Sequence, residues 1–366
     1  MTLPKMVLVT GATGLVGGGV LRRILADDLG VEVFALTRDA AGWNRLANAL
    51  GVLAPRVVPV RGDVTLPHLG LEPLVRRRLE LQISAIVHAA ADTSFSRTLQ
   101  HSLTVNAVGT ENVVRLAADC ARLERLSFVS TAFVAGRATG SIPEADNGCL
   151  AGWVNAYEES KYEAESIVRS TGLPWTVLRS STIVCRSSAG DVSQINAVHR
   201  ALRIYHRGLA AMMPGDRNNP LDVVTADFVS DAIARLTFDP RAEGKTVHLC
   251  AGRNALTLGE LVDTAYEVWA AEPAWRKRGV ERAMITDPET YRLFEQAVHQ
   301  TGDPRLRAIL TSLSYFIPQL ALPKVFETSV AEDLLGSAPP CSREFWLPML
   351  KQLLATNWGH SVREAA

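Results

Sequence analysis

The chain of 366 residues has few of the features that mark a secreted, metal-binding or membrane-spanning protein. Its five cysteines are scattered, odd in number and free of any Cys-x-x-Cys pair, so neither a disulfide framework nor a metal site is expected. No segment reaches about 18 uninterrupted apolar residues, and the start lacks a signal peptide. We therefore expect a cytoplasmic protein without a membrane span.

An excess of charge of one sign is also absent. The 38 lysines and arginines balance 38 aspartates and glutamates, which argues against a nucleic-acid-binding surface and favours small molecules as partners. Lysine itself is scarce, since Lys161 is the only one between Lys5 and Lys245. A lysine at that position therefore calls for an explanation.

Short apolar, β-branched runs alternate with longer helical patterns over the first half of the chain. This alternation is typical of βαβ units and predicts an α/β protein with a Rossmann-type, doubly wound parallel sheet. The expected strands are Met6–Thr10, Val31–Leu36, Arg56–Val60, Ala85–Ala89, Leu126–Ser130, Trp175–Arg179 and Lys245–Ala251. The expected helices include Thr110–Leu123, Val198–Leu209 and Leu256–Trp269, with a turn-rich loop at Met212–Val224.

Three glycines, Gly11, Gly14 and Gly17, lie between the first strand and the helix that follows it. Glycine there permits a tight turn and close approach of the backbone to a pyrophosphate, while the helix N-terminus attracts the phosphates. The pattern predicts a dinucleotide-binding turn, and a plain flexible turn is the alternative. It does not explain Gly18 and Gly19, each of which costs a helix about 1 kcal/mol relative to alanine.

The end of the second strand bears on the choice of cofactor. Arg38 can pair bidentately with the 2′-phosphate of NADP, whereas an acidic residue would hold the ribose hydroxyls of NAD. Arg38 favours NADPH, and the neighbouring Asp39 keeps NADH open. We expect residues 1–185, with 220–265 returning to them, to form this NADP-binding domain. Residues 186–219 and 266–366 would form a smaller, mainly helical substrate-binding lobe at the carboxyl edge of the sheet.

Tyr157 and Lys161 are four residues apart in a stretch that favours a helix. They therefore share one helix face, where an ammonium can approach the phenol and lower its pKa from about 10. Thr131, at the end of the fifth strand, provides a hydroxyl for a substrate oxygen. The alternative is a solvated Tyr/Lys pair together with an ordinary turn threonine.

The chain carries a series of motifs in the order seen in extended short-chain dehydrogenases/reductases: TGATGLVG, GDV, HAAA, NAVGTENVVRLA, FVSTAFVAG and YEESK. It most resembles the thioester reductase, or male sterility, group in the stretches HAAADTSFS, VSTAFVAGRATGSIPEAD and NAYEESKYEAE. That group includes fatty acyl-CoA reductases and the terminal reductase domains of peptide synthetases and carboxylic acid reductases.

The resemblance implies roles for individual residues. The catalytic residues would be Thr131, Tyr157 and Lys161. The cofactor would contact Gly11, Thr13, Gly14, Leu15, Val16, Gly17, Arg38, Asp63, Val64, Ala89, Ala90, Ala91, Asn106, Tyr157, Lys161, Ser180 and Ile183. One departure concerns the nicotinamide contacts, because related proteins commonly have Arg-Pro where this chain has Arg179 and Ser180.

The resemblance also implies a reaction, namely NADPH-dependent reduction of an acyl thioester to an aldehyde, with further reduction to an alcohol left open. The substrate would be an acyl-CoA or the thioester of an acyl or peptidyl carrier protein, met in trans because the chain has no carrier domain of its own. The basic stretch Trp275–Ala283 is a candidate docking patch or a solvated face. The apolar, aromatic stretch Leu313–Phe326 fits an acyl or pantetheine tunnel better than a nucleotide pocket, and fits a core equally well.

Two other functions stay open on the residues alone. One is an extended short-chain epimerase, dehydratase or hydroxyl dehydrogenase that acts on a sugar nucleotide or a sterol-like alcohol. The other is a dinucleotide-sensing module without catalysis, which would have no need of Thr131, Tyr157 and Lys161.

Overall fold

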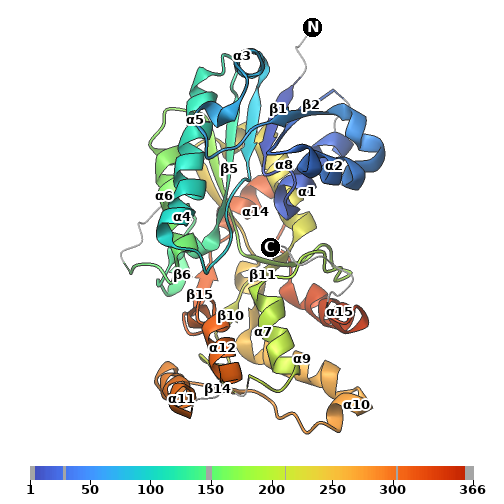
Figure 1. Ribbon diagram of the computed structural model, residues 1–366, viewed down its shortest axis with the longest axis vertical. Coiled ribbons are helices and arrows are strands. Elements are labelled where there is room, and N and C mark those ends of the chain that lie inside the picture. Colours follow the sequence, from blue (N-terminus) through green and yellow to red (C-terminus); the bar gives the residue numbers. More distant parts are fainter. Residues whose placement is uncertain (1–4, 28–29, 146–150, 211, 302–303, 359–366) are drawn as a thin grey trace.

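The computed structural model describes residues 5–27, 30–145, 151–210, 212–301 and 304–358. The chain forms two units stacked along the long axis of the molecule (Figure 1). The upper unit holds a β-sheet between helices, and the lower unit is a mainly helical lobe. The division of the chain at residues 185, 220 and 265 stays a prediction.

Seven parallel strands form the sheet in the order β12-β7-β5-β4-β1-β2-β3. The strands are β1 (Met6–Thr10), β2 (Glu32–Thr37), β3 (Val57–Arg61), β4 (Ala85–His88), β5 (Arg125–Thr131), β7 (Trp175–Ser180) and β12 (Lys245–Leu249). This confirms the predicted fold class. The strand order reverses between β1 and β4, so the carboxyl ends of these two strands border the crevice in which ligands of such sheets bind.

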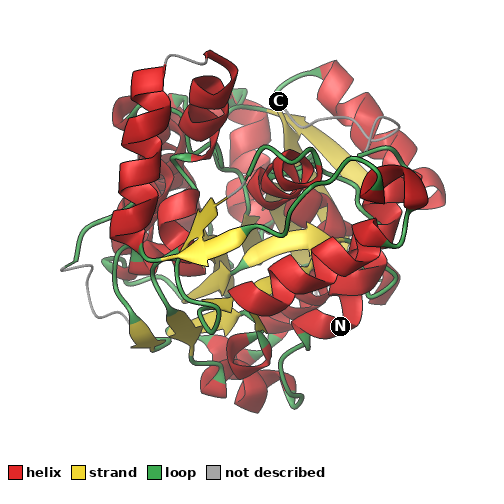
Figure 2. Cartoon of the chain, turned by 90° about the horizontal axis from the view of Figure 1, so that it is seen from below, coloured by secondary structure: helices red, strands yellow, loops and turns green. Residues whose placement is uncertain are grey.

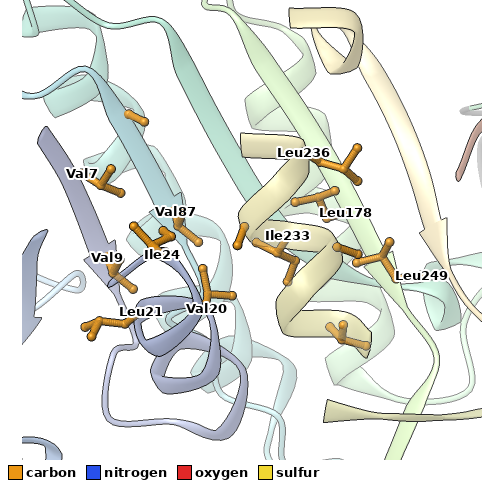
Figure 3. Packing of buried hydrophobic residues seen from close by; sticks show 14 of the residues in the cluster. Val7, Val9, Val20, Leu21, Ile24, Val87, Leu178, Ile233, Leu236 and Leu249 are labelled. Carbon is orange, nitrogen blue, oxygen red and sulfur yellow. The ribbon is translucent and has the colours of Figure 1, made fainter. Parts of the chain in front are cut away.

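Helices cover both faces of the sheet, which is why its strands are almost continuously apolar. One face carries α1 (Leu15–Asp27), α2 (Ala40–Leu50), α8 (Ala226–Phe238) and α14 (Ser329–Leu335). The other carries α3 (Pro73–Gln82), α5 (Gly109–Asp119) and α6 (Ala156–Arg169). Figure 3 shows the packing on the first of these faces, where Ile24 of α1 lies beside Val87 of β4 and Ile233 of α8 lies near Leu178 of β7. A short helix α4 (Leu99–Leu103) and a π-helical turn (Thr104–Val108) lead into α5.

The lobe has its own apolar core, built on helices that Figure 2 shows from below. They are α7 (Ala197–His206), α9 (Leu258–Ala270), α10 (Pro273–Arg276), α11 (Pro288–Thr301), α12 (Pro304–Leu313), α13 (Ile317–Leu320) and α15 (Ser342–Ala355). Four pairs of short strands tie the lobe together and to the sheet unit. They are β6 (Gly140–Ile142) with β15 (Lys324–Phe326), β8 (Thr182–Cys185) with β11 (Val223–Thr225), β9 (Met212–Pro214) with β14 (Met284–Thr286), and β10 (Pro220–Leu221) with β13 (Leu256–Thr257).

The prediction of a loop at Met212–Val224 is therefore wrong in part. Its residues form β9, β10 and most of β11, each held by a strand distant in the sequence. Strands of two or three residues have no periodicity of their own, so the local pattern could not reveal them.

Within the described ranges, no helix is both long and apolar enough to cross a membrane, and no cluster of three or more His, Cys, Asp or Glu side chains could hold a metal ion. Cys120, Cys185, Cys250 and Cys341 are free thiols, and Cys149 lies outside the described residues. The cytoplasmic location stays a prediction.

The two glycines left unexplained by the sequence have steric reasons. A Cβ on Gly18 would lie 3.0 Å from the carbonyl oxygen of Ala12, and a Cβ on Gly19 would lie 2.2 Å from Oγ of Ser230 on α8. Glycine at position 19 therefore lets α1 and α8 pack closely on the same face of the sheet.

We expect Gly19→Ala to lower the free energy of unfolding by about 1–2 kcal/mol, because overpacking against Ser230 outweighs the gain in helix propensity. Adding Ser230→Ala should recover part of the loss, since the Oγ atom is then removed. Denaturant titration measures both effects. Gly172→Ala is the matched control, because a Cβ there meets nothing within 4 Å. Equal losses at positions 19 and 172 would contradict the steric explanation.

Candidate active site

The glycine turn is folded tightly against the end of β4. Gly11 has a φ of 66°, and a Cβ on it would lie 2.6 Å from the carbonyl of Ala89 and the nitrogen of Ala90. A Cβ on Gly17 would lie 2.3 Å from the carbonyl oxygen of Gly11, while the Gly14 nitrogen donates to that same oxygen at 2.9 Å. The crowding explains why these positions need glycine.

The same turn leaves room for phosphate. Thr13 and Gly14 are exposed, and α1 begins at the next residue, Leu15, with Val16 in its first turn. The free N–H groups of a helix start and its partial positive charge suit a diphosphate, so the predicted loop fits a dinucleotide. The fit supports the predicted contacts of Gly11 to Gly17, Ala89 and Ala90.

The predicted catalytic residues come together between β5 and α6. Thr131 is the last residue of β5, and its hydroxyl lies near the phenol of Tyr157 on the first turn of α6. Lys161, one turn further along α6, donates from Nζ to the carbonyl oxygen of Val129 on β5 at 2.7 Å. Its ammonium also lies 4.1 Å from the centre of the Phe128 ring. The helix carrying Tyr157 is thus fastened to the strand that carries Thr131.

The electrostatics of the pair differ from the expectation that Lys161 lowers the pKa of Tyr157. Burial, which disfavours a phenolate, raises the pKa of Tyr157 to about 12, with Glu158 and Asp92 adding to the rise and the nearby Thr131 hydroxyl opposing it. Burial likewise lowers the pKa of Lys161 to about 7, against the attraction of Glu165. Tyr157 is therefore protonated at neutral pH, as a proton donor must be.

The chain matches the family model described as "Male sterility protein" over residues 9–233, which is more than half of its length. The chain belongs to the male sterility protein family. This confirms the resemblance predicted from the motifs. The members of this family are NAD(P)H-dependent reductases, which confirms the prediction of a nicotinamide dinucleotide cofactor.

Individual relatives and structures agree with this assignment. Fatty acyl-CoA reductase 8 of Arabidopsis thaliana is 24% identical over 70% of this chain and 68% of its own length. Isonitrile lipopeptide synthase of Streptomyces coeruleorubidus is 30% identical over 92% of this chain, which spans only 23% of that synthase. The crystal structure of the terminal R domain from the myxalamid PKS-NRPS pathway matches with a TM-score of 0.79 at 26% identity, over 99% of this chain and 94% of that one.

The structure places Asp63 and Val64 just after β3, at the edge of the sheet where the family's adenine contacts are expected. Asp63 Oδ1 accepts hydrogen bonds from the nitrogen and Oγ1 of Thr65 at 2.9 and 2.8 Å. The Val64 carbonyl accepts one from Asn112 Nδ2 on α5 at 2.9 Å. These bonds fix the loop, and the adenine contact itself stays a prediction.

Asn106 connects the loop after β4 to the helix that carries Tyr157. Its Nδ2 donates to Ser160 Oγ at 2.9 Å and to the Asp92 carbonyl at 3.0 Å, and its Oδ1 accepts from the Asp92 nitrogen at 2.8 Å. Ser160 Oγ in turn donates to the carbonyl of Tyr157 at 3.0 Å. Asn106 lies in the π-helical turn, a distortion frequent at functional sites. In this structure it holds the backbone around Ala91 and Tyr157, and its predicted cofactor contact stays untested.

The remaining predicted contacts lie at the end of β7 and beyond. Ser180 is the register partner of Thr131, which brings this departure from the family pattern beside the catalytic trio. Ile183 lies in β8, and its carbonyl accepts a hydrogen bond from Asn196 Nδ2 at 2.7 Å. Their contacts with the nicotinamide stay a prediction.

Sequence reasoning missed one aromatic neighbour of Tyr157. The ring of Phe95 lies 5.5 Å from the ring of Tyr157 and also packs against the core of the lobe. Phe95 belongs to the stretch HAAADTSFS that carried the family resemblance, so the motif contained the signal without showing its role.

A buried ion pair supports α6 one turn beyond Lys161. Glu165 and Arg179 are 1% and 4% exposed, and Arg179 donates from Nε and Nη2 to the two carboxylate oxygens at 2.9 and 2.7 Å. Arg179, with Arg169, holds the pKa of Glu165 at about 2.

We expect Arg179→Met to lower the free energy of unfolding by about 3 kcal/mol near neutral pH, because the buried Glu165 then loses its bidentate partner and keeps only the single bond from Arg169 and the attraction of Lys161. The pKa of Glu165 is depressed in the folded state, so the wild-type advantage is complete above about pH 4.5 and shrinks as pH falls toward 2. Urea titration across pH measures it. Arg253→Met, which breaks an exposed pair with Glu332, is the control and should change little. A pH-independent loss would contradict the role of the Glu165 charge.

Proposed function

We propose that this protein reduces acyl thioesters to aldehydes with NADPH. The observation that carries the proposal is the placement of the Thr131 hydroxyl near the phenol of Tyr157, with Lys161 anchored to the same strand. The choice of a thioester rests on the relatives, which are named as a fatty acyl-CoA reductase and as a terminal R domain of a PKS-NRPS pathway. The site offers what such a reduction needs, namely a proton donor and a hydroxyl aimed at one substrate oxygen.

NADPH, when bound, supplies the hydride that reaches the thioester carbon. Thr131 Oγ1 and Tyr157 Oη hold the carbonyl oxygen as negative charge develops on it, and Tyr157 gives that oxygen its proton. In its ammonium form Lys161 has two donors beyond the one bonded to Val129, and these would hold the nicotinamide ribose. The hemithioacetal formed from the substrate then breaks its C–S bond, which releases an aldehyde and a free thiol.

Support for NADPH over NADH comes from the end of β2. Asp39 Oδ1 accepts a hydrogen bond from the Gly42 nitrogen at 2.6 Å, so this carboxylate caps α2. Arg38 is exposed and makes no hydrogen bond or ion pair within the described part of the chain. Arg45, which sequence reasoning missed, reaches the same turn, with Nη2 3.8 Å from where a Cβ on Gly42 would lie. Two guanidinium groups are thus at hand for a 2′-phosphate.

The thiol of the substrate stays open between CoA and a carrier protein. In the stretch Trp275–Ala283, Trp275 is buried and Arg282 is paired with Asp263 at 2.8 Å, while Arg276, Lys277 and Arg278 are exposed. A docking role for them is untested. Several side chains of Leu313–Phe326 lie in the core of the lobe and border a cavity of only about 30 Å³, which is too small for an acyl chain as it stands.

The proposal predicts that the purified protein oxidises NADPH with acyl-CoA or acyl-carrier thioesters and yields an aldehyde. Tyr157→Phe should bind NADPH as tightly as the wild type and lose about 10²–10⁴-fold in turnover, since the phenol is the proton donor. Absorbance at the NADPH band and product identification give the readout. Sugar nucleotides and sterol-like alcohols serve as the contrasting substrates. Turnover of those alone, or full activity of Tyr157→Phe, would overturn the proposal.

Arg38→Ala should weaken NADPH binding by about tenfold and leave NADH binding unchanged, because only the 2′-phosphate loses a charge-assisted partner. Fluorescence titration of both cofactors measures the change. Arg207→Ala, an exposed arginine at the end of α7 in the lobe, is the matched control. Equal weakening of NADPH and NADH binding would contradict a contact with the 2′-phosphate and would show that Arg38 only supports the loop.

A further inference from the structure

A chain of polar side chains, buried at both ends and half-buried at Gln319, joins the lobe to the first turn of α6, directly beside Tyr157. Glu158 is only 1% exposed. Its Oε1 accepts hydrogen bonds from Gln319 Nε2 on α13 at 2.6 Å and from Asn155 Nδ2 at 3.1 Å, and its Oε2 accepts one from the Val154 nitrogen at 2.9 Å. The residue that follows the expected proton donor is therefore held by a side chain of the lobe that lies 161 positions away in the sequence.

The chain continues from Gln319 to a buried cation. Lys324 is 5% exposed and donates from Nζ to Gln319 Oε1 at 2.8 Å. Lys324 is the first residue of β15, which pairs with β6 beneath α6 (Figure 1). An amide between a carboxylate and an ammonium can satisfy both in one orientation only, with its nitrogen toward Glu158 and its oxygen toward Lys324. The arrangement is thus directional and fixed at both ends.

A second bond links the same two segments. Asn155, the N-cap of α6, donates from Nδ2 to the carbonyl of Tyr315 at 3.3 Å while its Oδ1 accepts from the Glu158 nitrogen at 3.1 Å. On its other side the segment is anchored by Phe316, Ile317 and Leu320, which are buried in the core of the lobe. The start of α6 therefore rests on a well-anchored part of the lobe.

The charges around this link are few. Glu158 faces Lys324 and Arg137, whose attraction opposes the rise that burial causes in its pKa. Tyr157 faces Glu158, Asp92 and the Thr131 hydroxyl. An ionised carboxylate buried beside a tyrosine is costly unless it is paired and hydrogen-bonded, and Gln319 and Lys324 provide that compensation.

We propose that Gln319 and Lys324 are positioning residues for Tyr157, because through Glu158 they fix the first turn of α6, and so the phenol, relative to the lobe. The inference rests on the proposed function, in which Tyr157 donates the proton. It adds that the lobe orients the proton donor as well as covering the substrate. None of the three side chains needs to touch the substrate for this effect.

Reciprocal exchange of the two side chains provides the sharpest test. Gln319→Glu places two carboxylates against each other and should lower kcat by about ten- to a hundredfold, with the Kd for NADPH unchanged. In the double variant E158Q/Q319E, the amide at position 158 can accept from the Val154 nitrogen and donate to the carboxylate at position 319, which pairs directly with Lys324. Asn155 Nδ2 loses its bond to position 158 there and keeps the one to the Tyr315 carbonyl. The double variant should therefore return to within about threefold of the wild-type kcat. A double variant no more active than Gln319→Glu would overturn the proposal.

Gln319→Met keeps the volume and removes both hydrogen bonds. It should lower kcat by about tenfold at a temperature where the variant is fully folded, and should alter the alkaline limb of the kcat profile, because Glu158, which faces Tyr157, loses the hydrogen bond that fixes its carboxylate. Glu159→Gln is the matched control, since it neutralises a charge on the same turn of α6 and should behave as the wild type. Wild-type kcat in Gln319→Met, whatever its melting temperature, would show that the link is only structural and overturn the proposal.

Hydrogen exchange separates this inference from the proposed function. Amides in the first turn of α6 should exchange faster in Gln319→Met than in the wild type without any substrate, while amides of α5 stay protected. Unchanged exchange in α6 would count against the link. A wild type that reduces no thioester would instead refute the proposed function, and the exchange result would still decide whether the lobe orders α6.

Discussion

The bond between the Lys161 ammonium and the Val129 carbonyl is the interaction on which the site depends. It fastens α6 to the carboxyl end of β5, so that Tyr157 meets Thr131 there. The ammonium lies over the Phe128 ring and is almost fully buried. Burying a cation there would be energetically costly without the Val129 carbonyl, the Phe128 ring and Glu165 one turn away. Glu165 in turn needs Arg179 on β7. The catalytic helix is therefore held to two adjacent strands by charge as well as by apolar packing.

Much of the fold could be predicted from the sequence. Parallel strands that are buried on both faces have short continuous apolar sequences. The sequence therefore predicted all seven strands of the sheet to within one or two residues of their observed bounds. Gly11, Gly14 and Gly17, and the spacing of Tyr157 and Lys161, are local signals as well, because a turn and a helix face are set by neighbouring residues. The short strands β9 and β10 escaped because only their distant partners define them.

The parts of the site that could not be predicted depend on contacts between distant segments. The sequence predicts a lowered pKa for Tyr157, and this prediction was wrong because burial raises the pKa. Burial is a property of the folded chain, whereas the spacing to Lys161 indicates only that the two side chains are close. The reason for Gly19 lies on α8, and the partner of Glu158 lies on α13. Phe95 was part of a motif, yet nothing in the sequence said that its ring would face Tyr157.

The position of β12 has a consequence for how the chain folds. This strand closes the β7 side of the sheet, yet the chain enters it only after passing through the first part of the lobe, which includes α7, β9 and β10. As the protein emerges from the ribosome, the hydrogen-bonding edge of β7 lacks its neighbour until residue 249 has been made. During that interval the nascent chain offers an open, apolar strand edge, the kind of surface that recruits chaperones or pairs with the wrong partner. Folding of the nucleotide-binding half therefore cannot be completed independently of the first part of the lobe.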